Sequence, residues 1–198
     1  MDRRARGLAF ALVGTALGGA ALAWGDDLRW ALQHRPDVWK AEDAGDGLTP
    51  NAREDAEKWE RIDKLFKGAL LLMHAGEHAR AITALNGVLA LDPGLVDARV
   101  NLGFCHVAVE DWHAALVDFD LAVEMRPEQA NAYYGLAVTL HELGDLEEAV
   151  GNMRTYVHLA GERDPFQAKA MALLLEWEEA LRTEREIEAA ELAAREAP

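Results

Sequence analysis

Cysteine is nearly absent from this chain, which has a single one, Cys105, among 198 residues. One cysteine allows no intrachain disulfide, and it cannot supply a cysteine-based zinc, iron–sulfur or haem-attachment motif. Because no cysteine lies near the N-terminus, a lipid-modified N-terminus of the lipoprotein kind is not expected either. The compartment in which the chain works therefore has to be inferred from other features.

Basic residues are scarce as well, and no long stretch of them occurs. Lysine and arginine number 20 against 35 aspartates and glutamates, which gives a formal charge of −15. Without a contiguous basic stripe the chain cannot displace the counterions of a nucleic acid, so we expect no nucleic-acid partner. Isoleucine, threonine and proline are few, while alanine and leucine dominate. This composition favours helix over sheet and predicts an all-α protein.

Catalytic and metal-binding motifs are also missing. His74 and His78 are four residues apart, but Gly76 lies between them, and no H-E-x-x-H or related spacing occurs. The sequence has neither a G-x-S-x-G turn nor a phosphate-binding or dinucleotide-binding glycine motif. We therefore expect no enzyme activity, no metal site and no cofactor.

The N-terminal residues 1–24 have the pattern of a membrane anchor. Three arginines within the first six residues precede the uncharged run 7–24, and Asp26 and Asp27 follow it. Eighteen helical residues rise about 27 Å, close to the roughly 30 Å of a bilayer's hydrocarbon core. Basic residues before the run and acids after it place the N-terminus in the cytoplasm. We therefore predict a single-pass protein of a bacterial inner membrane whose body is periplasmic.

A cleaved signal segment is the alternative to an anchor. Residues 21–23, Ala-Leu-Ala, have the small-x-small form of a signal-peptidase site, and cleavage near Ala23 would leave a soluble periplasmic protein. Trp24 and Trp30 favour retention, because tryptophan suits the membrane interface. Residues 25–49 are predicted to be a connector with a short helix interrupted by Pro36.

The strongest pattern is an internal repeat. A shift by 34 residues superposes residues 62–95, 96–129 and 130–163 without a gap. Small residues are needed where two helices cross closely, and large ones fill the space between neighbouring hairpins. The aligned sets are Ala81, Ala115 and Ala149; Ala69, Gly103 and Ala137; Leu85, Phe119 and Met153; Leu72 and Leu140; Gly76 and Gly144; and Pro93 and Pro127. The repeat predicts three helix–turn–helix hairpins, each covering the apolar face of the next.

This pattern resembles the tetratricopeptide repeat, which has a period of 34 residues. The matching residues are Leu65, Ala69, Leu72, Gly76, Ala81, Leu85 and Pro93; then Leu102, Gly103, Ala115, Phe119, Ala122 and Pro127; then Tyr133, Leu136, Ala137, Gly144, Ala149 and Met153. The sequence departs from the signature at Gly68, His106, Glu110 and Gly161. The resemblance implies a helix–turn–helix solenoid of three hairpins within residues 50–182, closed by a capping helix at 165–182. Residues 183–198 are expected to form a helical extension or tail.

The resemblance also implies a function. Such arrays bind a protein in a concave groove lined by the first helix of each hairpin. The residues expected to line it here are Phe66, Leu70, Met73, Val100, Asn101, Phe104, Val107, Asn131, Tyr134, Val138 and His141. Family members that grip a C-terminal carboxylate use a basic, asparagine-rich clamp, of which only Asn101 and Asn131 remain, while Gly135 stands at another clamp position. We therefore expect an apolar peptide or helix as the partner.

Two functions fit these expectations. The first is an assembly or recruitment factor that binds other proteins on the periplasmic face of the membrane. The alternative is a permanent structural subunit of a membrane-bound complex of the respiratory or photosynthetic type. In both, residues 7–24 contact the membrane.

Overall fold

The computed structural model describes residues 50–161, 164 and 166–196, and every regular element in this part is a helix. The predicted anchor at 1–24 and connector at 25–49 lie outside the described residues. The helices are α3 (Pro50–His74), α4 (His78–Leu91), α5 (Val96–Ala108), α6 (Trp112–Met125), α7 (Ala130–Leu143), α8 (Leu146–Leu159) and α9 (Gln167–Glu196).

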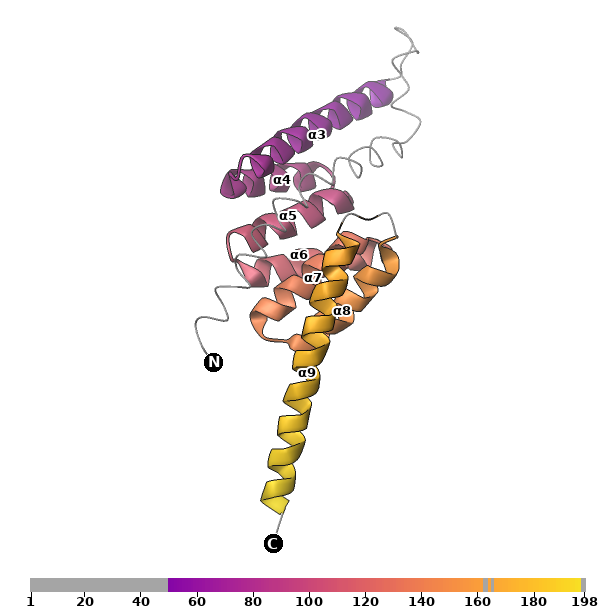
Figure 1. The fold of residues 1–198 in the computed structure, drawn as a ribbon. Coiled ribbons are helices and arrows are strands. Elements are labelled where there is room, and N and C mark those ends of the chain that lie inside the picture. Colours follow the sequence, from indigo (N-terminus) through magenta and orange to yellow (C-terminus); the bar gives the residue numbers. More distant parts are fainter. Residues whose placement is uncertain (1–49, 162–163, 165, 197–198) are drawn as a thin grey trace.

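The helices pack as three hairpins in a row. The partners within a hairpin are α3 with α4, α5 with α6 and α7 with α8, and successive hairpins meet through α4 with α5 and α6 with α7. Figure 1 shows this stack, with α9 laid against its last hairpin. Each hairpin thus covers a face of the next one, as in a solenoid. The predicted fold class, an all-α solenoid of three hairpins plus a C-terminal helix, is confirmed.

The first helices of the second and third hairpins pack directly on each other. Helix α5 packs on α7 more extensively than α4 packs on α6 or α6 packs on α8. Between the second and third hairpins, the first helices are therefore closer together than the second helices. We call the surface formed by α3, α5 and α7 the inner face.

The turns inside the hairpins follow from local chemistry. Gly76 and Gly144 have φ of +75° and +90°, the left-handed conformation that ends a helix without a steric penalty for glycine. Glu110 occupies the same place in the middle hairpin and also has a positive φ, 60°, which is unfavourable for a residue with a Cβ. Asp111 and Asp145 then cap α6 and α8, because each carboxylate accepts a hydrogen bond from the backbone N–H three residues on.

The small residues of the repeat lie where helices cross. The three alanines of one predicted column have no exposed surface, as have two members of the other: Ala81, Ala115 and Ala149, and Ala69 and Ala137. Interiors packed to this density have no room for a larger side chain. The columns therefore mark contact points of the fold.

Phe119 of α6 wedges between two first helices. Its ring has no exposed surface and lies against the backbones of Gly103 in α5 and Gly135 in α7. A Cβ built on Gly103 would lie 2.7 Å from Cε1 of Phe119, and one on Gly135 would lie still closer. Glycine at both positions lets α5 and α7 approach the same ring.

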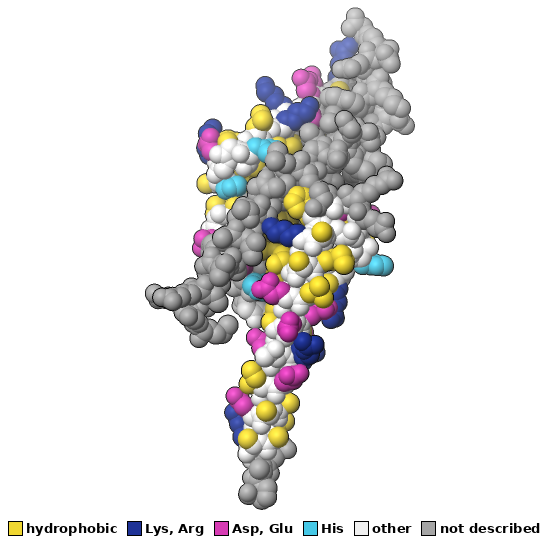
Figure 2. All heavy atoms as spheres, viewed as in Figure 1, with side chains coloured by type: hydrophobic (Ala, Val, Ile, Leu, Met, Phe, Trp, Pro, Cys, Tyr) yellow, Lys and Arg dark blue, Asp and Glu magenta, His cyan; other side chains and the backbone are white. Residues whose placement is uncertain are grey.

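Helix α9 continues well beyond the hairpin on which it packs. It has 30 residues, about 45 Å in length, and it buries Ala170 and Trp177 near its start. Residues 182–195 are all exposed. Figure 2 shows hydrophobic side chains over the first part of α9 and acidic and basic ones mixed along the projecting part. Within residues 50–161, 164 and 166–196, no helix has the length and apolar character needed to span a membrane.

Candidate protein-binding face

The residues predicted to bind a partner all lie on first helices. Phe66, Leu70 and Met73 belong to α3; Val100, Asn101, Phe104 and Val107 to α5; and Asn131, Tyr134, Val138 and His141 to α7. Leu70, Asn131 and His141 are half-buried and the other eight are buried. The hairpin geometry therefore brings the predicted set onto the inner face. That these residues bind a partner stays a prediction.

Two aromatic residues of this set are buried rather than open on the face. Phe104 and Tyr134 are only 4% and 8% exposed. Phe104 packs edge-on against Phe119 at a centroid distance of 4.8 Å, and Tyr134 contacts Tyr156 of α8 at 5.2 Å. Both rings thus reach the second helices of their hairpins. Burial raises the pKa of Tyr134 to about 12, so its hydroxyl stays neutral.

Two buried oxygens on α5 lack donors. The Asn101 amide donates to the carbonyl of Asp97 at 2.7 Å, but its Oδ1 accepts no hydrogen bond from any described residue. Asp97 accepts from Arg126 through Oδ1 at 3.2 Å, whereas its Oδ2 has no partner among the described residues. Burial raises the pKa of Asp97, and the charge of Arg126 opposes that shift. Buried acceptors without donors are rare in folded proteins, so both atoms call for an explanation.

A second acid lies between α5 and α6. Asp118 accepts hydrogen bonds from Arg99 at 3.1 Å and from His106 at 2.9 Å. Burial raises the pKa of Asp118, while Arg99 and His106 oppose the shift. In the sequence, His106 stands out only as a departure from the tetratricopeptide-repeat signature. The signal that could have found the cluster is the spacing of Arg99 and His106, seven residues apart on one side of a helix.

Helix α9 closes one end of the inner face. The His141 ring of α7 stacks on Trp177 of α9 with centroids 4.5 Å apart and planes 12° apart. One side of this predicted partner-binding residue is therefore covered by the chain itself.

Histidines and acids form no metal centre in the described part of the chain, where no three His, Cys, Asp or Glu residues could hold one ion. His74 ends α3, with its Nδ1 2.8 Å from the carbonyl oxygen of Leu70, while His78 begins α4. Cys105 is fully buried, and burial raises the pKa of its thiol to about 12. The thiol is therefore protonated and unreactive at neutral pH.

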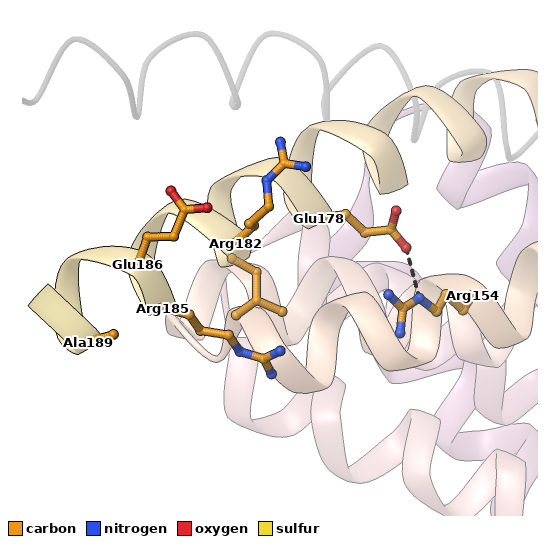
Figure 3. A pocket seen from close by; sticks show the side chains of 7 residues that line it. Arg154, Glu178, Arg182, Arg185, Glu186 and Ala189 are labelled. Carbon is orange, nitrogen blue, oxygen red and sulfur yellow. Dashed lines mark hydrogen bonds and ion pairs between the residues drawn. The ribbon is translucent and has the colours of Figure 1, made fainter.

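A hollow of about 320 Å³ lies between α8 and α9. Figure 3 shows its arginines and glutamates interleaved. Arg154 donates to Glu178 at 2.8 Å, and Arg185 donates to Glu147 at 2.6 Å. Both guanidinium groups already pair with glutamates. The hollow is therefore an ion-paired junction between α8 and α9.

A family model described as tetratricopeptide repeat matches residues 119–151. The match begins in α6, includes all of α7 and ends in α8, so it crosses from one hairpin into the next. The three stacked hairpins have the same architecture. The chain has the tetratricopeptide-repeat fold.

Several proteins of known sequence or structure are similar to this chain. Superkiller protein 3 of Saccharomyces cerevisiae is 26% identical over 99 residues, which are 50% of this chain and 7% of that protein. This chain therefore spans a small fraction of that relative's length.

Solved structures match over longer stretches. The Yersinia enterocolitica type III secretion chaperone SycD, in complex with a peptide of the translocator YopD, is 17% identical with a TM-score of 0.58; the match covers 64% of this chain and 95% of that one. The Sgt2 tetratricopeptide-repeat domain of Aspergillus fumigatus is 24% identical with a TM-score of 0.53, covering 69% and 85%. At these identities the likeness shows the fold.

Proposed function

We propose that this chain is a protein-binding scaffold held at the periplasmic face of a bacterial inner membrane, where it acts as an assembly or recruitment factor through its inner face. The partner is an apolar peptide or helix that lies along α3, α5 and α7. This assignment agrees with the peptide complex of SycD, a protein of the same fold.

The observation that carries the proposal is the pair of donor-less oxygens on α5. Asn101 Oδ1 and Asp97 Oδ2 are buried and accept no hydrogen bond from the described residues. A buried acceptor without a donor costs about 1–3 kcal/mol, which a bound peptide can recover by presenting N–H groups. Half-buried members of the predicted set, Leu70 of α3 and His141 of α7, would supply contact area for the same peptide.

The membrane location rests on sequence. The basic residues before 7–24, and the acids that follow, predict an anchor with the repeat outside the cytoplasm. A fusion of alkaline phosphatase after residue 60 is expected to be active, because this enzyme requires the periplasm. An inactive fusion that remains cytoplasmic would refute this location.

Partner binding can be tested with two neighbouring leucines of α3. Leu70 is half-buried on the predicted binding face, whereas Leu71 is 71% exposed. We expect Leu70→Glu to weaken partner capture at least about tenfold, which is about 1.4 kcal/mol, because it places a charge against an apolar partner. The matched control Leu71→Glu should bind normally. Thermal melts of both variants separate lost binding from lost folding, and equal binding by two folded variants would contradict the proposal.

Purification of the full chain in mild detergent separates the two membrane functions. Exchangeable partners in less than equimolar amount are expected of an assembly factor. A complex of fixed stoichiometry that survives purification would instead favour a permanent structural subunit.

A further inference from the structure

Two buried aspartates of the middle hairpin differ in how their carboxylates are paired. Both oxygens of Asp118 accept hydrogen bonds, Oδ1 from Arg99 at 3.1 Å and Oδ2 from His106 at 2.9 Å. Asp97 accepts from Arg126 through Oδ1 at 3.2 Å, while its Oδ2 has no donor among the described residues. Each aspartate is only 5% exposed. Because buried polar atoms normally have hydrogen-bond partners, Asp97 is left with one open acceptor position.

A second acceptor lies one helical turn from Asp97. Asn101 is four residues further along α5, which places its Cβ about 5–6 Å from that of Asp97 on the same side of the helix. Its amide donates to the backbone carbonyl of Asp97 at 2.7 Å, and its Oδ1 accepts nothing from the described residues. We call these two side chains the α5 acceptor site. Two buried acceptors without donors are unfavourable, so a bound group should bring N–H donors.

The equivalent position in the first hairpin shows which group completes such a site. A shift by 34 residues places Asp97 on Asp63 of α3 and Asn101 on Lys67. Lys67 donates to Oδ2 of Asp63 at 2.8 Å, so a cation of the chain itself lies on that carboxylate. In α5 the lysine is replaced by an amide whose NH₂ group donates to the backbone. The middle hairpin therefore keeps the acid of this pair and lacks the cation.

The third hairpin has neither member of the pair. In α7 the two positions are occupied by Asn131 and Gly135, which carry no charge. Among the three first helices that the structure describes, α5 is thus the one that has the acid without the lysine. The complementary group is cationic, because charge-assisted hydrogen bonds are about twice as strong as neutral ones. Lysine and arginine carry several N–H donors on long apolar stems, which suits a carboxylate with so little exposed surface.

We propose that the α5 acceptor site binds a lysine or arginine side chain of the partner peptide. This inference rests on the proposed function, because it names a residue that a peptide lying along α3, α5 and α7 must carry. The cation donates to Asp97 Oδ2 and Asn101 Oδ1, while the apolar remainder of the peptide lies along the inner face. Arg126 keeps its contact with Asp97 Oδ1, so the occupied carboxylate has a cation on each oxygen. The formal charge of −15 favours the approach of such a partner.

Peptide selection on the full chain in detergent tests this preference. The probe is a phage-displayed library of random 12-residue peptides, selected against the unaltered protein and against Asp97→Asn. We expect the unaltered chain to enrich peptides with lysine or arginine at one position among apolar residues, and Asp97→Asn to lose this enrichment. The control Glu188→Gln, which removes one negative charge from an exposed position of α9, should keep it. Enriched peptides without a fixed cation, or no enrichment, would overturn the inference.

A double-mutant cycle on an enriched peptide then locates the contact. Replacing its cationic residue by norleucine should weaken binding at least tenfold to the unaltered chain, and less than threefold to Asp97→Asn. Asn101→Lys is a second variant that retains the carboxylate and reproduces the pair of α3. Its lysine should pair with Asp97, so its binding should also be nearly indifferent to norleucine. Thermal melts identify the variants that fold, and equal weakening in the unaltered chain and in either folded variant would overturn the inference.

The same peptides separate this inference from the proposed function. Apolar peptides that carry no cation, but bind Leu70→Glu more weakly, would refute the cation site and support the inner face as the binding surface. Peptides that bind Leu70→Glu normally, but lose affinity for Asp97→Asn, would support the cation site and contradict the predicted groove. The two proposals can therefore fail independently.

Discussion

Replacing Gly135 by alanine tests the wedge at the centre of the fold. The new Cβ would lie 2.6 Å from Cε2 of Phe119 and closer to two other ring carbons. Non-bonded carbons prefer about 3.5–4 Å, so the ring or α7 must move by about 1 Å. The ring has little freedom to move, since Phe119 is fully buried and contacts Phe104 at 4.8 Å. The substitution therefore creates overpacking.

Two opposing effects set the magnitude. Overpacking of a core costs about 1–3 kcal/mol. Alanine in place of glycine inside a helix gains about 1 kcal/mol of helix propensity. Because the clash involves a locked ring, we expect the upper part of the overpacking range and a net loss of about 1–2 kcal/mol for Gly135→Ala.

Gly151→Ala is the matched control. Gly151 is exposed in α8, and a Cβ built on it meets nothing within 4 Å. This variant should gain up to about 1 kcal/mol, so the difference between the two variants isolates the overpacking. Urea titration and thermal melts measure it, at roughly 2–4 °C in Tm per kcal/mol for a domain of this size. Two variants of equal stability would refute the placement of Phe119 against Gly135.

Three further substitutions test other parts of the fold. Ala115→Leu, at a fully buried crossing, should lower the free energy of unfolding by about 1–3 kcal/mol, and an unchanged urea midpoint would mean that the repeat register is wrong. Glu110→Gly should raise the melting temperature by relieving a φ of 60°, at a gain of about 1 kcal/mol; no gain would contradict that backbone geometry. The pKa of Asp120 is raised above 3.8 by burial and by Glu124, so its ionised form destabilises the fold. Asp120→Asn should therefore stabilise the protein at pH 7 by a fraction of a kcal/mol, and this gain should vanish as the pH falls to 3.8.

Much of the fold follows from spacing alone, because the repeat fixes which residues are small and which are large. Ala81 and Ala115 share a column of the repeat, and both are fully buried in the structure. The tightest contact was not predictable in this way. Gly135 stood out only as a lost clamp residue, and its contact with Phe119 depends on how one hairpin rotates onto the next.

The exposed fraction of the predicted binding residues also could not be predicted from the sequence. Helical periodicity places Phe104 and Tyr134 on first helices, but both are buried because their rings reach Phe119 and Tyr156 on second helices. The 34-residue period predicts the helix face on which a side chain lies. Its exposed fraction is determined by ring contacts across the hairpin, which the period does not predict. That Asn101 Oδ1 finds no donor among the described residues could not be foreseen for the same reason, since hydrogen-bond pairing depends on the neighbours that fold against it.

The packing of the core also determines the geometry of the inner face. Phe119 sits against Gly103 of α5 and Gly135 of α7, so one ring sets the separation of two helices of the inner face. Interiors are close-packed and transmit strain, so a side chain added at this wedge should spread α5 from α7. A peptide bound along both helices would then lose the spacing it needs, although Gly135 itself need not touch it. Stability and binding should therefore fall together in Gly135→Ala, whereas Ala115→Leu, which enlarges a crossing inside one hairpin, should lower stability with a smaller effect on binding.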